Sequence, residues 1–251
     1  MGRVKIAKKS TFIDMTAMSD VTVLLLTFFM LTSTFLNKEP ATVITPPSVS
    51  ELKVQETNYL QVLVDPQGKK VWITMHNDTS QAYSNEAMRA KLLSQAAVLY
   101  NEQHPSNKVN FSQEQIAAFA KLNTFGVPMK NMGEFLDLAK EGPSGVSKMY
   151  KWHEGKFPNP KRPGQMMPTG IPIEMQSDKE HLDEFQIWMK AARMVANDEG
   201  SPLAEKIKEG TGVAIKADQN TSFEVVHIVM DNLQTINLNK FTLLTALKEG
   251  E

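Results

Sequence analysis

The stretch VTVLLLTFFMLTSTFL, residues 21–36, runs for sixteen residues without a charged side chain. Extending it back to Ala17 gives twenty residues. As an α-helix that span measures about 30 Å, which is enough to cross a bilayer. It contains one ionisable residue, Asp20. The sequence therefore predicts a membrane-spanning helix over residues 17–36 that carries a single acid.

The charges on either side of this segment predict its orientation. Only Lys38, beside Glu39, follows the segment closely. The first ten residues contain no acid and four basic residues: Arg3, Lys5, Lys8 and Lys9. Because short basic flanks stay on the cytoplasmic side, residues 1–16 are predicted to be cytoplasmic and the chain after residue 36 extracytoplasmic.

A cleavable signal peptide is the alternative interpretation of the same N-terminus. A basic start, an apolar stretch and the small residues after it fit such a peptide loosely. The length of the apolar run, the acid at its start and the lack of an A-x-A-like cleavage site favour a retained anchor.

Asp20 is the residue of this segment that calls for an explanation. An Asp at the centre of a spanning helix costs about 2.5–3.5 kcal/mol, and less near the interface. Thr27 follows it by seven residues, Thr34 by fourteen, and Thr16 precedes it by four. These spacings keep all four side chains near one face of a helix, which indicates a helix packed against protein or a wet path.

Two plainer interpretations stay open for this polar stripe. Asp20 can be an interfacial acid that only marks the end of the helix. Threonine hydroxyls can hydrogen-bond to carbonyl groups of their own helix, so their spacing alone proves little.

Composition excludes several other classes of protein. A formal net charge of -1 with charged residues interleaved along the chain does not indicate a nucleic-acid partner. There is no cysteine, hence no disulfide or thiolate site, and no nucleotide-binding, zinc-protease or nucleophile-elbow motif is present. We therefore predict no enzyme activity, no cofactor and no metal. An enzyme is a rival hypothesis whose candidate residues have no supporting spacing: Glu102, His104, His153, Glu154 and His181.

The rest of the chain shows alternating strand and helix patterns. Residues 37–57 contain Pro40, Pro46 and Pro47 and are predicted to form an extended linker. Strands are predicted at 59–64 and 70–75 around a turn at 65–68, and again at 212–217 and 241–247, with a helix at 222–234.

Between these elements lies a long segment, roughly residues 76–211. Amphipathic helices are predicted there at 85–101, 113–122 and 182–195. Residues 142–172 contain eleven Gly or Pro in thirty-one positions, which predicts a long irregular loop.

Residues 13–31, IDMTAMSDVTVLLLTFFML, resemble the N-terminal helix of ExbD/TolR proteins. Thr16 and Asp20 match the family's Thr and its proton-carrying Asp. Ala17 stands where the family usually has Pro, and Ser19 replaces a common aliphatic residue. The resemblance extends to the strands and the helix predicted around the long segment, and it covers about half of the chain.

The resemblance implies a fold of the α/β (α+β) class. One N-terminal transmembrane helix would be followed by a two-layer periplasmic domain, ββαβαβ-like, over residues 58–251. Residues 76–211 would form a large, mostly helical insertion, because the family usually has one helix and short loops there.

The resemblance also implies a function. The chain would be a subunit of a proton-motive-force-driven motor of the inner membrane, as a homodimer inside a ring of an ExbB/TolQ-like multi-helix protein. Asp20 would carry the proton, Thr16, Thr27 and Thr34 would face the pore, and a TonB-like periplasmic client would receive the motion. A TolR-like envelope-integrity motor and a signal-anchored extracytoplasmic binding or structural protein are the alternatives.

Overall fold

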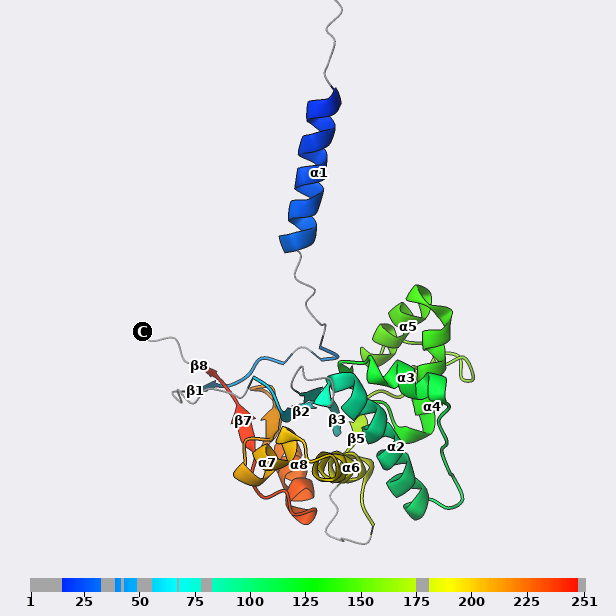
Figure 1. The fold of residues 1–251 in the computed structure, drawn as a ribbon. Coiled ribbons are helices and arrows are strands. Elements are labelled where there is room, and N and C mark those ends of the chain that lie inside the picture. The colour runs from blue at the N-terminus through cyan, green and yellow to red at the C-terminus, as the bar shows by residue number, and fades with distance from the viewer. Residues whose placement is uncertain are drawn as a thin grey trace, which may run out of the picture. The chain divides into compact units, whose positions relative to one another are not determined.

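The computed structural model describes residues 15–32, 39–41, 43–48, 56–66, 68–77, 83–174 and 181–247. The chain divides into two compact units, residues 1–38 and residues 39–251. In the first unit the described residues form one helix, α1 (Met15–Thr32). The second unit is a mixed α/β domain (Figure 1).

The described elements of the second unit alternate between strands and helices. In chain order they are β1 (Pro47–Ser48), β2 (Tyr59–Val64), β3 (Lys70–His76), α2 (Asn85–Gln103), α3 (Gln113–Ala120), β4 (Thr124–Phe125), α4 (Met129–Asp137), the 3-10 helix η2 (Leu138–Glu141), α5 (Pro143–His153), β5 (Ile171–Pro172), α6 (Glu184–Asp198), α7 (Pro202–Glu209), β6 (Val213–Lys216), α8 (Phe223–Thr235), β7 (Thr242–Leu244) and β8 (Ala246–Leu247).

The central sheet has the order β4-β3-β2-β6-β7, with β5 paired to β3. β2 and β3 form an antiparallel hairpin in which Val64 faces Val71, whereas β2–β6 and β6–β7 are parallel. The predicted strands at 59–64, 70–75 and 212–217 and the helix at 222–234 are thereby confirmed. The elements β2, β3, β6, α8 and β7 follow the expected ββαβαβ-like order, with the helices of the long segment between β3 and β6.

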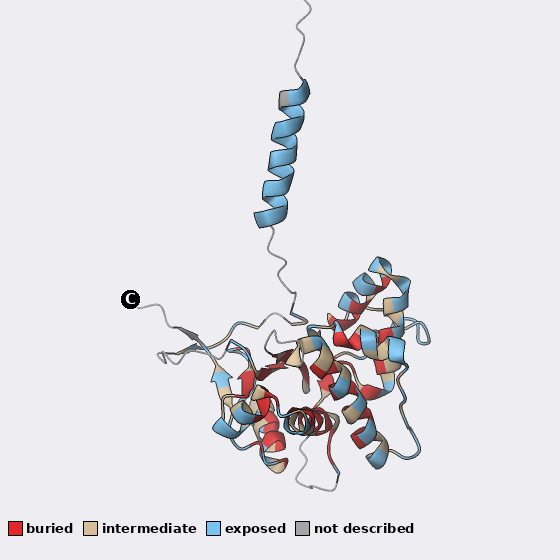
Figure 2. Ribbon diagram, viewed as in Figure 1, coloured by how far each residue is buried: buried red, intermediate tan, exposed pale blue. Residues whose placement is uncertain are grey.

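Side chains alternate between the two faces of this sheet. Leu60, Val62 and Val64 of β2 belong to the main hydrophobic core, and Ile215 of β6 joins them from the neighbouring strand. The helices of the long segment contribute to the same core, and Figure 2 shows their inward faces buried. The long segment is therefore part of one folding unit with the sheet.

Three fully buried aromatic rings connect two helices of the long segment with each other and with the sheet. Trp188 of α6 stacks on Phe119 of α3 at 5.7 Å between ring centroids and lies 4.9 Å from Phe125 of β4. Phe125 lies in the strand that pairs with β3, opposite Ile73. Such aromatic pairs stabilise a core beyond their buried area.

The predicted helices start where capping residues stand. Ser84, Ser112 and Asp183 are the N-caps of α2, α3 and α6, and each accepts a hydrogen bond from the third helical amide. Ser112 and Asp183 belong to full capping boxes, in which a glutamine side chain accepts a hydrogen bond from the amide of the cap residue. Two helices that the apolar pattern did not predict, α4 and α7, also lie in the long segment.

The prediction of an irregular loop over residues 142–172 was wrong in its first third, which forms α5. Pro143 is the first helical residue, where its missing amide hydrogen costs nothing, and Gly142 before it has φ +65°. Gly145 lies against the carbonyl of Leu138, where a Cβ would come within 1.7 Å of the oxygen. Gly142 and Pro143 thus mark the start of a helix, and Gly145 allows a close contact inside it. The high Gly and Pro content therefore did not indicate a loop here.

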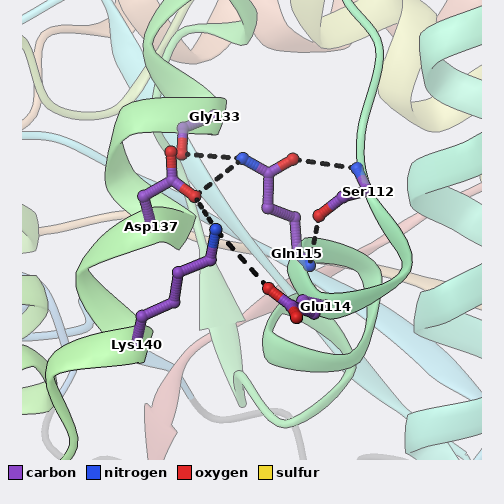
Figure 3. A network of polar contacts seen from close by, with 6 residues as sticks. All are labelled: Ser112, Glu114, Gln115, Gly133, Asp137 and Lys140. Atoms are coloured by element: carbon purple, nitrogen blue, oxygen red, sulfur yellow. Dashed lines mark hydrogen bonds and ion pairs between the residues drawn. The ribbon is translucent and has the colours of Figure 1, made fainter.

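A polar network fixes α3 against α4 and η2 (Figure 3). The side-chain amide of Gln115 donates to the carbonyl of Gly133 at 3.3 Å and to the carboxylate of Asp137 at 3.1 Å. The Oε1 atom of Gln115 accepts from the amide of Ser112 at 2.9 Å. The side chain of Gln115 thus caps its own helix and joins that helix to α4.

A second polar cluster, this one buried, ties α6 to α8. The side-chain amide of Asn232 donates to the carboxylate of Asp183 at 2.8 Å and to the carbonyl of Glu174 at 2.8 Å. Burial raises the pKa of Asp183 to about 6, although hydrogen bonds from the amides of Gln186 and Glu174 act in the opposite direction.

His153 is a buried titratable group without a charged partner among the described residues. Its ring lies 4.7 Å from that of Phe135, and 7% of the residue is exposed. Burial lowers the pKa of His153 to about 4. The neutral imidazole is therefore the form that the folded domain holds at neutral pH.

Asp183 and His153 give the stability of the domain opposite dependences on pH. The unfolded histidine binds a proton near pH 6.5, so His153 makes stability fall as the pH drops from 6.5 to 4. The folded Asp183 binds a proton near pH 6 but the unfolded one only near 4, so its contribution rises over the same range. Each effect amounts to roughly 3 kcal/mol. We expect Asp183→Asn to make the domain more acid-sensitive than the wild type, and His153→Phe less so.

Urea unfolding followed by tryptophan fluorescence between pH 4 and 7 measures both slopes. The comparison uses the pH dependence of each variant, so a constant loss of stability from the substitution does not disturb it. A His153→Phe variant with the wild-type slope would contradict the burial of a neutral imidazole.

Candidate functional site

The candidate site lies on α1, the helix of the first unit. Its large apolar side chains are exposed by 52% to 86%, and Figure 2 shows the helix exposed along its length. At about 100° per residue these side chains occur on every side of the helix. A helix that is apolar all round is stable inside a protein assembly or a membrane rather than alone in water. Asp20, the sixth residue of α1, is exposed on this apolar surface and forms no ion pair with any described residue.

The structure places Thr16, Asp20 and Thr27 on one unbroken helix. Seven residues along an α-helix return almost to the same direction, about 20° off, so Thr27 lies on the side of Asp20. Thr16, four residues earlier, is about 40° off that direction at 100° per residue. Thr34, the fourth residue of the predicted stripe, lies outside the described residues.

Some hydroxyl groups of α1 do hydrogen-bond to carbonyl groups of their own helix, as the simpler interpretation of the threonines expects. Thr27 donates its hydroxyl hydrogen to the carbonyl of Leu24 at 2.9 Å, and Thr22, on the opposite face, donates to Met18 at 2.7 Å. Such bonds satisfy the donor but leave oxygen lone pairs free to accept. Thr27 can therefore still accept a hydrogen bond from water or from a partner.

The predicted span of residues 17–36 is described only as far as Thr32, where α1 ends. In the described part of the chain, no helix combines the length and the apolar character that crossing a membrane requires. The membrane-spanning helix thus stays a prediction.

The residues of the rival enzyme hypothesis do not form a common site. His104, at the end of α2, stacks on Tyr100 at 4.2 Å between ring centroids, whereas His153 lies on α5 against Phe135. Glu154 is paired with Lys156 at 3.0 Å. Among the described residues, no group of three or more His, Cys, Asp or Glu side chains is arranged to hold a metal ion.

A contact that the sequence did not predict holds the segment after α1 on the domain. The amide of Ile44 donates to the carboxylate of Asp218 at 2.7 Å, and the amide of Gln219 donates to the carbonyl of Ile44 at 2.8 Å. Lys216 pairs with Glu39 at 2.6 Å, and β1 runs parallel to β8. In the predicted linker of residues 37–57, the described residues 39–41 and 43–48 are thus held along the domain.

Comparison with protein families decides the classification. The family model described as "Biopolymer transport protein ExbD/TolR" matches residues 7–124. Residues 7–124, somewhat less than half of the chain, are thus similar to ExbD/TolR proteins. No curated protein and no solved structure matches the chain.

The ExbD/TolR match confirms the resemblance drawn from residues 13–31. It contains all of α1 with Asp20, and it continues through β2, β3, α2 and α3 to Thr124, the first residue of β4. The matched region thus enters the segment of residues 76–211 that we predicted to be an insertion. The boundaries of that insertion stay a prediction.

The residues around Asp218 carry a local signal for a carboxylate that accepts backbone amides, as in the contact with Ile44. Asp218 lies two residues after the end of strand β6, in the order Asp218-Gln219-Asn220-Thr221. An Asp at the end of a strand, before an Asn, is typical of a turn in which the carboxylate accepts backbone amides. Here Asp218 accepts from Asn220 at 2.9 Å as well as from Ile44.

The docking of residues 39–48 predicts a local effect of removing Asp218. Hydrogen bonds from the backbone amides of Asn220 and Ile44 favour the ionised carboxylate and hold the pKa of Asp218 below its ordinary value. We expect Asp218→Ala to speed hydrogen exchange of the Ile44 amide by about tenfold or more, because a bond to a charged acceptor is lost. Amides of α6, which do not contact this segment, serve as the internal reference; unchanged exchange at Ile44 would contradict the docking.

Proposed function

We propose that this chain is the proton-carrying subunit of an ion-driven motor of the inner membrane, of the ExbB–ExbD type. The observation that carries the proposal is a single ionisable residue, Asp20, on a helix whose other side chains are uncharged, within the region that matches the ExbD/TolR family. The charge-free run of residues 21–36 and the basic N-terminus support a cytoplasmic start and a periplasmic domain.

The physical task of Asp20 follows from the cost of its charge. An ionised Asp on an apolar surface costs several times more than the protonated acid, so the helix moves past lipid or apolar protein only after protonation. Ionisation requires a polar contact, which a partner of the ExbB/TolQ type supplies. A proton crossing the membrane field releases about 2.3 kcal/mol per 100 mV.

The positions of the threonines indicate on which side of Asp20 protons enter and on which side they leave. At ~1.5 Å per residue, Thr27 lies about 10 Å and Thr34 about 21 Å beyond Asp20 along a continuous helix. With the N-terminus in the cytoplasm, both lie on the periplasmic side, from which protons arrive. We assign Thr27 and Thr34 to a wet entry path and Thr16 to the release side.

The proposal includes the partners that the family implies. Two copies of the helix stand inside a ring of the multi-helix partner, and alternate protonation of their two Asp20 residues drives stepwise motion. The domain of residues 39–251 passes the motion to a periplasmic client. We favour a TonB-like client that powers outer-membrane transport; a TolR-like role in envelope integrity is the second candidate.

The principal rival is an anchored extracytoplasmic protein in which Asp20 is incidental. The fixed segment of residues 39–48 and the single large core of the domain suit a binding role equally well. The two proposals differ in one respect that can be measured, namely whether activity depends on the ionisable group of Asp20.

The test of the motor is Asp20→Asn, which keeps the shape of the side chain and removes its proton exchange. We expect proton-motive-force-dependent uptake to fall to background while the chain still reaches the membrane with its partner, as pull-down shows. Asp20→Glu, which retains an acid, should restore part of the activity. Loss of envelope integrity without loss of uptake would assign the TolR-like role, and full activity of Asp20→Asn would favour the anchored binding protein.

Thr22 and Thr27 provide a matched pair for the entry path. Both hydroxyls donate to carbonyl groups of their own helix, but only Thr27 lies on the side of Asp20. We expect Thr27→Val to slow uptake several-fold, because a hydrogen-bond acceptor leaves the path, and Thr22→Val to leave the rate unchanged. Equal effects of the two substitutions would overturn the assignment of Thr27.

A further inference from the structure

The segment of residues 146–166 differs in charge from the rest of the chain. It contains one acid, Glu154, and five basic residues: Lys148, Lys151, Lys156, Lys161 and Arg162. Its formal charge is therefore +4, whereas the whole chain carries -1. Positive charge is concentrated in a stretch to which the proposed function assigns no role.

This segment has a fixed shape. It comprises most of α5 and a hairpin-like turn in which Pro158 and Met166 form an antiparallel bridge. Trp152 of α5 stacks on Phe157 at 5.4 Å between ring centroids, and the amide of Met167 donates to the carbonyl of Phe157 at 2.8 Å. The turn is thus held against the end of α5, in the helical group of α3, α4 and α5 (Figure 1).

Apolar side chains are exposed on the same segment. Val146 and Tyr150 are 45% and 47% exposed, and Met166 in the turn is 57% exposed. Val146 and Tyr150 lie four residues apart on α5 and therefore one above the other on its outer side. We call residues 146–166 the basic–apolar segment.

Ion pairs neutralise the basic–apolar segment only in part. Lys148 pairs with Glu141, Lys161 with Glu134, and Lys156 with Glu154 inside the segment. Counting the two outside glutamates leaves a formal charge of +2. Lys151 and Arg162, both exposed, form no ion pair with a described residue.

We infer that the basic–apolar segment binds the anionic phospholipid headgroups of the membrane leaflet on the side of the domain. Basic residues beside exposed aliphatic and tyrosine side chains suit a lipid interface, where the charges meet headgroups and the apolar groups enter the acyl boundary. This inference rests on the proposed function, because it requires that α1 hold the chain in the membrane.

The length of the chain before the domain brings a lipid surface within reach. Only residues 33–38 separate the end of α1 from the first residue of the second unit. Six residues span at most about 20 Å. A soluble acidic partner would match the charges of the segment but would give no reason for the exposed Val146 and Met166, so lipid is the occupant that both features favour.

The test uses the full chain in vesicles, with a nitroxide label on Ser147→Cys. The chain contains no cysteine, so the label is unique, and Ser147 is exposed beside Val146. In vesicles with about a quarter phosphatidylglycerol in phosphatidylcholine, we expect collisions of the label with dissolved oxygen to rise about twofold or more over phosphatidylcholine alone. A label on Ser94→Cys, exposed on α2, should not respond.

Charge variants identify the residues responsible. Lys151→Glu with Arg162→Glu should abolish the response at Ser147, whereas the matched pair Lys108→Glu with Lys121→Glu, exposed outside the segment, should preserve it. A response that is absent in the unmodified chain, or that the two double variants change alike, overturns the inference. So does a label that ignores lipid charge but is immobilised by soluble polyglutamate, which would assign the segment to an acidic protein.

Flotation of the same vesicles separates this inference from the proposed function. A chain that does not float with the vesicles has no membrane anchor in α1, and both proposals fail. A chain that floats and shows no label response refutes the lipid contact alone, and the test of Asp20 is unaffected.

Discussion

The helix-side face of the β2–β3–β6 sheet has to be covered, and α2, α6 and α8 supply the cover together. Trp188 of α6 packs with Phe119 of α3 and Phe125 of β4 in the same core, and all three are fully buried. Removing so much apolar surface from water is the main favourable term in folding. Because the core is continuous, the long segment between β3 and β6 stabilises the sheet as well as itself.

Polar side chains then fix how the elements of this core meet. Asp183 caps α6 and accepts from Asn232 of α8, while Gln115 caps α3 and donates to α4. Each residue satisfies a helix end and an interhelical contact at once, so a rotation of either helix would break both contacts. At Asp183, which is buried, it would also leave buried polar groups without partners. The raised pKa of Asp183 reflects the unfavourable burial of its charged carboxylate inside the domain.

The two units have different roles in the proposed motor: the first carries the acid, and the second receives the motion. In the first, Asp20 stands on a helix whose described apolar side chains are exposed, so a partner that covered them would also set the surroundings of the acid. In the second, residues 39–48 are bound to the domain through Asp218 and Lys216. Any force passing along the chain from α1 therefore enters the domain at the end of the parallel strand β6.

The sequence by itself determined the elements whose signal is local. These elements, which could all be predicted from apolar pattern and capping residues, are the helix that carries Asp20, the β2–β3 hairpin, β6, α8 and the capped helices α2, α3 and α6. The side of α1 shared by Asp20 and Thr27 followed from helical geometry alone. Thr34 stays a prediction.

Only the tertiary structure decided the features that depend on residues far apart in the chain. Ile44 and Asp218 are 174 residues apart, and nothing in the local sequence around either residue predicts their contact. The sequence pattern did not predict α5 because Gly145 looks like a loop residue. It is in fact a helical residue at which the carbonyl of Leu138 leaves no room for a side chain. The short strands β4 and β5 and the shared core likewise form because distant surfaces must pack together, a requirement that no local pattern expresses.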